Sequence, residues 1–162
     1  MFATTAPTQP IHPDKIRSEI QALQPQLVAL RRLLHQHPEL GFKERLTAET
    51  IAKKLTEWQI PHQTGIAQTG IVAMIQGRKL SLHPKTLAIR ADMDALPIQE
   101  ANEVPYKSKH DGIMHACGHD GHIAIALMTA YYLSQQSHFD AGRGSKPSSA
   151  RSRRGHRVRR RA

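Results

Sequence analysis

Several features are scarce or missing in this sequence of 162 residues. Cys117 is the only cysteine, so an internal disulfide is excluded. The N-terminus lacks the basic stretch and following apolar run of roughly 7 to 15 residues that mark a secretory signal, and we therefore expect a cytoplasmic setting. No apolar run approaches the roughly 20 residues of a membrane-spanning helix, which predicts a protein that is soluble or peripheral at most.

Acidic residues are absent from the C-terminal stretch, which contains most of the excess positive charge. The formal net charge is +10, and residues 143–162 contain nine of the 23 Lys and Arg. The remaining 14 basic residues are nearly balanced by 13 acidic ones. A nucleic-acid-binding protein that uses the Arg-rich tail is therefore one alternative. The tail has no interleaved aromatic residues and the preceding chain presents no basic excess, so we expect neither a nucleic-acid nor a membrane partner.

Apolar periodicity predicts helices over residues 16–34 and 47–58 and a third that begins near residue 119. Runs of β-branched and apolar residues predict strands over 71–75, as a buried strand, and over 86–90, after a turn at 82–85. A proline-interrupted loop is expected from 96 to 114. This order of elements predicts an α/β fold in a single domain over residues 13–142, between a disordered leader (1–12) and a disordered tail (143–162).

The sharpest chemical signal is the segment H-A-C-G-H-D-G-H, residues 115–122, at a junction between loop and helix. Thiolate and imidazole are good ligands for Zn²⁺ and similar ions. Cys117 and His119 can face one volume only if the chain bends at Gly118, because a spacing of two does not share a helix face. The alternative is that Cys117 is a small buried apolar residue and that the histidines decorate the helix end.

Two further groups of polar residues are candidates. Asp92 and Asp94 follow the expected strand 86–90, at the end of a strand where open α/β sheets bind ligands, although Asp is also common in ordinary turns. The segment His37-Pro38-Glu39 follows the first helix, with His35 two residues earlier, and taken alone it is typical of a helix stop.

Together and in order, four motifs are specific: L-H-x-H-P-E-L-G-F, a G-I-V-A strand, I-R-A-D-M-D-A-L-P-I and M-H-A-C-G-H-D-G-H. With them the chain, from about residue 16 to 142, resembles the metal-dependent amidohydrolases that include hippurate hydrolase, N-acyl-amino-acid amidohydrolases and the plant auxin-conjugate hydrolases, within the dinuclear metallopeptidase superfamily. The resemblance implies the N-terminal part of a dinuclear-zinc-peptidase-like catalytic domain, with helices packed on a mixed sheet. It also implies an N-acyl amino acid as substrate and two divalent ions, Zn or Mn, that activate water.

The resemblance implies a role for individual residues. Cys117 and His119 correspond to metal ligands, and Asp94 to the catalytic carboxylate that orients the site. Weaker candidates are Asp92, Asp120 and His122, and His37 is expected to be structural. The resemblance leaves the metal, the preferred acyl group and amino acid, and any homo-oligomer of the full-length form open.

The sequence departs from the family after the third helix. The family's P-A-E-E-G motif, whose two glutamates act as general base and metal ligand, is absent, as are the later histidine ligands and the lid domain. One permitted set of codons for residues 152–161, read one nucleotide later, encodes Ala-Glu-Glu-Gly, whereas residues 144–149 need a shift of two. The tail is therefore hypothesised to be an out-of-frame translation. We expect weak metal binding, little or no turnover, poor solubility and marginal stability. The other alternative is a non-catalytic binding or regulatory fragment that keeps the first half of the fold.

Overall fold

Three helices form most of the regular structure. The computed structural model describes residues 13–77, 79–80, 86–136 and 140–141. The helices are α1 (Pro13–Gln36), α2 (Arg45–Glu57) and α3 (His119–Gln135), and the strands are β1 (His62–Ile66), β2 (Gly70–Ala73), β3 (Lys79–Leu80) and β4 (Asp140–Ala141). The expectations for residues 1–12, 82–85 and 143–162 lie outside the described residues.

Helix α1 confirms the first predicted helix and extends it by a few residues at each end. Pro13 occupies its first position, where the missing N–H costs no hydrogen bond, and Asp14 lies in the first turn, where the helix dipole favours negative charge. The buried residues of α1 are Leu30, Leu34 and His35, all in its C-terminal half. That half therefore anchors the helix, and His35 enters the core with it.

Helix α2 begins two residues earlier than expected, because a residue upstream caps it. The side chain of its N-cap residue, Glu44, makes no capping hydrogen bond. The carboxylate of Glu39 instead accepts hydrogen bonds from the backbone N–H groups of Leu46 (3.1 Å) and Thr47 (2.8 Å) and from the Thr47 hydroxyl (2.9 Å). These donors would otherwise be orphaned at the helix start.

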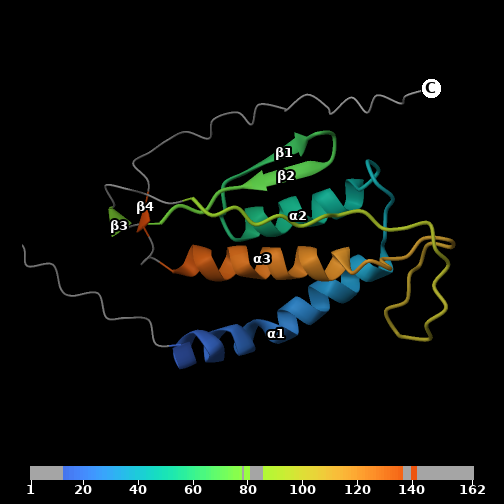
Figure 1. The fold of residues 1–162 in the computed structure, drawn as a ribbon, viewed down its shortest axis with the longest axis horizontal. Coiled ribbons are helices and arrows are strands. Elements are labelled where there is room, and N and C mark those ends of the chain that lie inside the picture. Colours follow the sequence, from blue (N-terminus) through green and yellow to red (C-terminus); the bar gives the residue numbers. More distant parts are fainter. Residues whose placement is uncertain (1–12, 78, 81–85, 137–139, 142–162) are drawn as a thin grey trace, which may run out of the picture.

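The strands form two separate pairs. β1 and β2 are antiparallel with His62 opposite Ala73, and β3 and β4 are parallel with Lys79 opposite Asp140. Figure 1 shows the β1–β2 hairpin lying along α2. A side chain at Gly70 would meet the carbonyl oxygen of Ile66 at 2.6 Å, so the hairpin requires glycine there. The sequence pattern does not predict β1, because the segment H-Q-T-G-I lacks apolar alternation.

Two expectations about buried strands are wrong. β2 covers the predicted strand 71–75 only in part, and it is half exposed, with Val72 at 47%. Residues 86–90 form no strand, and Leu87 and Ile89 are 84% and 57% exposed. A strand requires a hydrogen-bonded neighbour, and the described part of the chain offers none to this segment. The α/β class is nevertheless confirmed.

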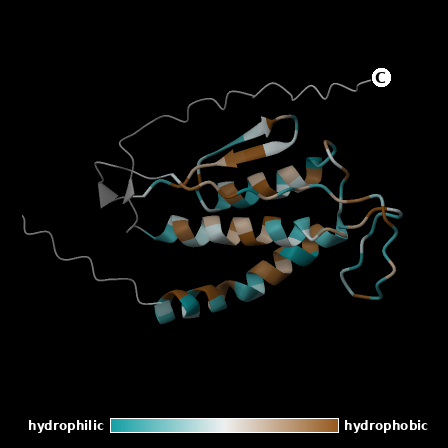
Figure 2. Cartoon of the chain, viewed as in Figure 1, coloured by the Kyte–Doolittle hydropathy of each residue, from teal (hydrophilic) through white to brown (hydrophobic). Residues whose placement is uncertain are grey.

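The hydrophobic core lies where α3 packs against α1 and α2, and in Figure 1 α3 runs between these two helices. Ile123 and Leu127, on the predicted inward face of α3, are buried, and so are Ala124 and Met128. The remaining core residues are Leu30, Leu34, Ile51, Leu55 and Ile60. The hydropathy colouring in Figure 2 shows apolar residues recurring along α3. No helix among the described residues is both long and apolar enough to cross a bilayer.

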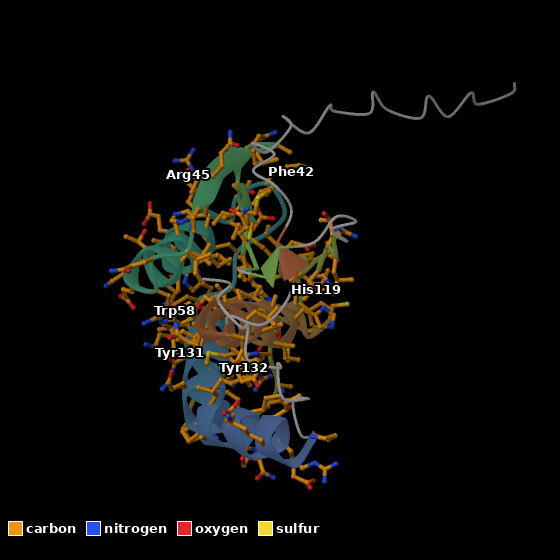
Figure 3. The ribbon with its side chains drawn as sticks, turned by 90° about the vertical axis from the view of Figure 1, so that its left-hand side faces the viewer. Phe42, Arg45, Trp58, His119, Tyr131 and Tyr132 are labelled. Atoms are coloured by element: carbon orange, nitrogen blue, oxygen red, sulfur yellow. The ribbon has the colours of Figure 1, made fainter. Side chains whose placement is uncertain are left out.

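Two aromatic contacts link α3 to its neighbours. The ring of Trp58, just after α2, lies 4.9 Å from that of Tyr131. The hydroxyl of Tyr132 donates a hydrogen bond of 2.9 Å to Glu19 of α1. Figure 3, in which α3 is viewed roughly along its axis, labels these aromatic side chains and His119, the first residue of α3. The end that begins with His119 is the one that carries the candidate chemistry.

Candidate metal-binding site at the start of helix α3

Asp94 and His119 lie in contact, although 25 positions separate them in the sequence. The Nδ1 atom of His119 is 3.0 Å from Oδ1 of Asp94 and 2.9 Å from the backbone oxygen of the same residue. The His119 side chain is 14% exposed and that of Asp94 is 39% exposed. Since Asp94 occupies Nδ1, the Nε2 atom is left to face a ligand. A carboxylate behind a histidine in this way is typical of metal sites.

Cys117 lies two residues before His119 in the chain and is exposed. Between it and His119, Gly118 has a left-handed backbone (φ 79°, ψ 17°) and forms the N-cap of α3. This is the bend that the spacing of the two side chains required, and glycine adopts it without steric cost. Because Cys117 is exposed, the alternative interpretation of it as a small buried residue is wrong.

The weaker candidates have different surroundings. Asp92 forms an ion pair with Arg90 on the exposed segment before the site. His122 is exposed, and its ring lies 5.7 Å from that of His119 at an interplanar angle of 31°. Neither side chain is buried.

Asp120 is fully buried, with a relative exposure of 0%. Its Oδ2 atom lies 2.7 Å from Nε of Arg31 and 2.8 Å from Nδ1 of His35, both on α1. Its Oδ1 atom has no hydrogen-bond partner among the described residues. Asp120 therefore fixes the first turn of α3 to α1 through two basic side chains, a role that the sequence did not indicate.

His35 reaches a second carboxylate on the loop 96–114. Its Nε2 atom lies 3.2 Å from Oε1 of Glu100, which is 3% exposed. Burial alone would raise the pKa of Glu100, but hydrogen bonds from Ser108 N–H, His35 and Asn102 outweigh it, so the pKa lies below its ordinary value of 4.5. Glu100 therefore remains ionised inside the protein. Sequence inspection missed it because a glutamate in a loop gives no periodic signal.

His115 is a third buried polar residue near the site. It is 3% exposed, and neither ring nitrogen has a hydrogen-bond partner among the described residues. Its pKa is lowered, chiefly by burial, although the negative charge of Asp120 works in the opposite direction. The ring is therefore neutral at pH 7.

The segment His37-Pro38-Glu39 supports the site from α1. Besides capping α2, Glu39 accepts a hydrogen bond of 2.7 Å at its backbone oxygen from the N–H of Ala95, the neighbour of Asp94. His37 packs against His110, with ring centroids 6.0 Å apart. A shallow cavity of about 220 Å³ beside His37 is lined otherwise by Leu33, Leu34, Leu46, Thr47 and Thr50, none of which belongs to the Asp94–His119 pair.

The donor set fits one side of a metal site. Cys117 and His119 supply sulfur and nitrogen, and Asp94 orients the imidazole. Within the described ranges, however, no three or more His, Cys, Asp or Glu side chains are grouped so that they could hold an ion. Two ligands leave a four-coordinate site half built, so further donors are needed to close it.

The chain is similar in sequence to known hydrolases. Residues 88–144 match the model of peptidase family M20/M25/M40. The chain is 44% identical over 119 residues to hippurate hydrolase of Campylobacter jejuni and 41% identical over 122 residues to an N-acyl-L-amino acid amidohydrolase of Geobacillus stearothermophilus. These alignments cover 74% and 75% of this chain but 30% and 32% of the relatives.

A solved structure is also similar. The dinuclear metal binding peptidase of the M20 family from Bacillus subtilis superposes with a TM-score of 0.67 at 45% identity, covering 73% of this chain and 33% of that one. The chain thus spans about a third of the length of the proteins that it matches.

Proposed function

Because the chain belongs to peptidase family M20/M25/M40, we propose that it forms part of a metal-dependent hydrolase that cleaves the amide bond of small N-acyl amino acids. The reaction class is hydrolysis of carbon–nitrogen bonds other than peptide bonds. The observation that carries the proposal is the contact of 3.0 Å between His119 and Asp94, with the exposed Cys117 two residues before His119. Residues 13–142 would form the N-terminal part of the catalytic domain of this hydrolase. The protein would be cytoplasmic.

In this proposal Cys117 and His119 hold a divalent ion, of zinc or manganese, through Sγ and Nε2. Asp94 acts through His119. Its carboxylate accepts a hydrogen bond from the Nδ1–H group and so fixes the tautomer in which Nε2 carries the free lone pair. When bound, the ion would polarise the amide carbonyl and lower the pKa of water toward neutrality. His122, one turn along α3 from His119, and Asp92 are the next candidates around the same volume.

The general base that such hydrolysis needs is not among these residues. Asp94 is committed to His119, Asp120 to Arg31 and His35, and the A-E-E-G motif is absent from the sequence. We therefore expect the 162-residue chain to bind metal weakly and to turn over little or no substrate. The nucleic-acid alternative depends on residues 143–162, outside the described part of the chain, and the matched relatives are hydrolases.

The purified chain tests this proposal with Co²⁺, whose bond to a thiolate gives a charge-transfer absorption in the near ultraviolet. We expect this band in the wild type, its loss in Cys117→Ser and in His119→Ala, and its retention in His110→Ala as the matched control. Absence of the band at saturating cobalt would refute the metal site. Hydrolysis of hippurate or N-acetyl-methionine at rates ordinary for enzymes, after addition of Zn²⁺ or Mn²⁺, would instead contradict the expectation that this chain turns over little or no substrate.

A further inference from the structure

The end of α1 reaches both halves of the Asp94–His119 pair. His35 is bonded to Asp120, the residue after His119, and the backbone oxygen of Glu39 is bonded to Ala95, the residue after Asp94. We propose that His35 is a positioning residue of the site, which holds the turn of Cys117 and His119 in register with Asp94. This inference rests on the function proposed above for that pair.

Both ring nitrogens of His35 contact carboxylates. Nδ1 lies 2.8 Å from Oδ2 of Asp120 on α3, and Nε2 lies 3.2 Å from Oε1 of Glu100 on the loop. Both partners are carboxylates, so each ring nitrogen has an acceptor within hydrogen-bond distance. Hydrogen bonds to an ionised carboxylate are the shorter and stronger kind. With a relative exposure of 3%, His35 has no room to leave this geometry.

Basic side chains and carboxylates are paired in this cluster. Arg31 contacts Asp120, His35 contacts both Asp120 and Glu100, and the Arg31 guanidinium is also 5.3 Å from the centre of the Tyr106 ring. Such pairing avoids an isolated buried carboxylate, but apolar side chains of the same volume often stabilise a core equally well. A network of this kind therefore fixes where its members sit, more than it adds stability.

The position that it fixes is that of the first turn of α3. Asp120 follows His119 directly, and its Oδ2 atom contacts both His35 and Arg31. Without His35, Asp120 would keep one partner, Arg31, whose side chain is 34% exposed. Glu100, by contrast, would keep Ser108 and Asn102. Removing the His35 ring would therefore loosen chiefly the turn that contains Cys117 and His119.

The test compares His35→Gln, which replaces the two ring nitrogens by one amide group, with Leu55→Ala, which creates a cavity in the core away from the cluster. In the metal-free protein, ¹⁵N-resolved spectra of the imidazoles report whether Nδ1–H of His119 is bonded to Asp94. We expect His35→Gln to shift this signal toward that of an unbonded ring and to weaken Co²⁺ binding by about 10- to 100-fold, the range known for residues that orient metal ligands. Leu55→Ala should lower stability and leave both readouts unchanged at equal folded fraction.

An unchanged His119 spectrum in folded His35→Gln would overturn the inference, and so would an equal change in Leu55→Ala. If His35→Gln does not fold, Glu100→Gln is used in its place. This substitution weakens the contact of His35 with residue 100, while the side chain keeps its size and one acceptor oxygen. A smaller shift in the same direction is then expected, and no shift would again overturn the inference. Failure of the wild type to bind cobalt refutes the proposed function alone, since the metal-free spectra still decide on His35.

Discussion

His119 is held by Asp94 through two oxygens at once. Its Nδ1 atom lies 2.9 Å from the backbone oxygen of Asp94 and 3.0 Å from the carboxylate. The backbone contact fixes the position of the ring, and the carboxylate adds negative charge behind it. These two contributions can be separated by substitution, because only the second depends on the side chain.

Asp94→Asn is expected to weaken Co²⁺ binding at Cys117 and His119 by about tenfold or more. The amide is neutral, so it polarises the imidazole less than the carboxylate does, while the backbone contact persists. Titration with cobalt, followed by its thiolate absorption, measures the change. Asp111→Asn is the matched control, since Asp111 is exposed on the loop 96–114 and belongs to no part of the proposed site. Equal affinities in Asp94→Asn and wild type would remove Asp94 from the site.

Glu39→Ala is expected to lower the free energy of unfolding by about 1–2 kcal/mol. The substitution leaves two backbone N–H groups at the start of α2 and the Thr47 hydroxyl without their acceptor. Urea denaturation followed by circular dichroism provides the value. Glu49→Ala, on an exposed position of the same helix, should change stability by no more than about 0.5 kcal/mol. A similar small effect at Glu39 would show that the cap is dispensable.

Glu100 should make the protein less stable in acid. Its pKa lies below 4.5 in the folded state, so the unfolded chain takes up the proton first as the pH falls. The stabilisation is therefore complete above the unfolded value and is lost as the pH drops through the interval down to the folded pKa. Urea denaturation of wild type and Glu100→Gln from pH 7 downward tests this. The difference in stability should shrink below about pH 4.5, and a difference that is constant with pH would contradict the assignment.

Replacing Leu87 and Ile89 together by serine should reduce self-association without unfolding the chain. Both side chains are exposed, at 84% and 57%, so each substitution should change stability by no more than about 0.5 kcal/mol. Contiguous exposed apolar surface promotes association, and its removal should shift sedimentation profiles toward the monomer. A loss of several kcal/mol would instead reveal that these side chains are buried in the folded chain, and the description of this segment would then be wrong.

The sequence predicted the helices well, because each repeats apolar residues every three or four positions and carries a recognisable start or stop. Pro13 and Gly118 mark two of the three starts. The strands were predicted less well. β1 is too polar to show a pattern, and the apolar run 86–90 remains unpaired because strand formation depends on a neighbour elsewhere in the chain.

Within the candidate site, the sequence motifs indicate which residues are candidates but not which of them are in contact. The structure places Asp94 against His119, and the roles of Cys117, His119 and Asp94 in binding or orienting a metal remain predictions. Asp120, a weaker candidate from the sequence, is buried against α1. Its partner His35 could not be found from spacing, because 85 positions separate the two residues.

That separation bears on the order in which the chain folds. The C-terminal half of α1 has a buried histidine whose two acceptors lie 65 and 85 positions downstream. During synthesis, α1 leaves the ribosome long before Glu100 and Asp120 exist, and its apolar face has no complete surface to pack against in that interval. Contacts so distant in sequence are slow to form, and the waiting segment is exposed to aggregation. The arrangement that steadies the start of α3 thus completes itself only when almost all the described residues have been made.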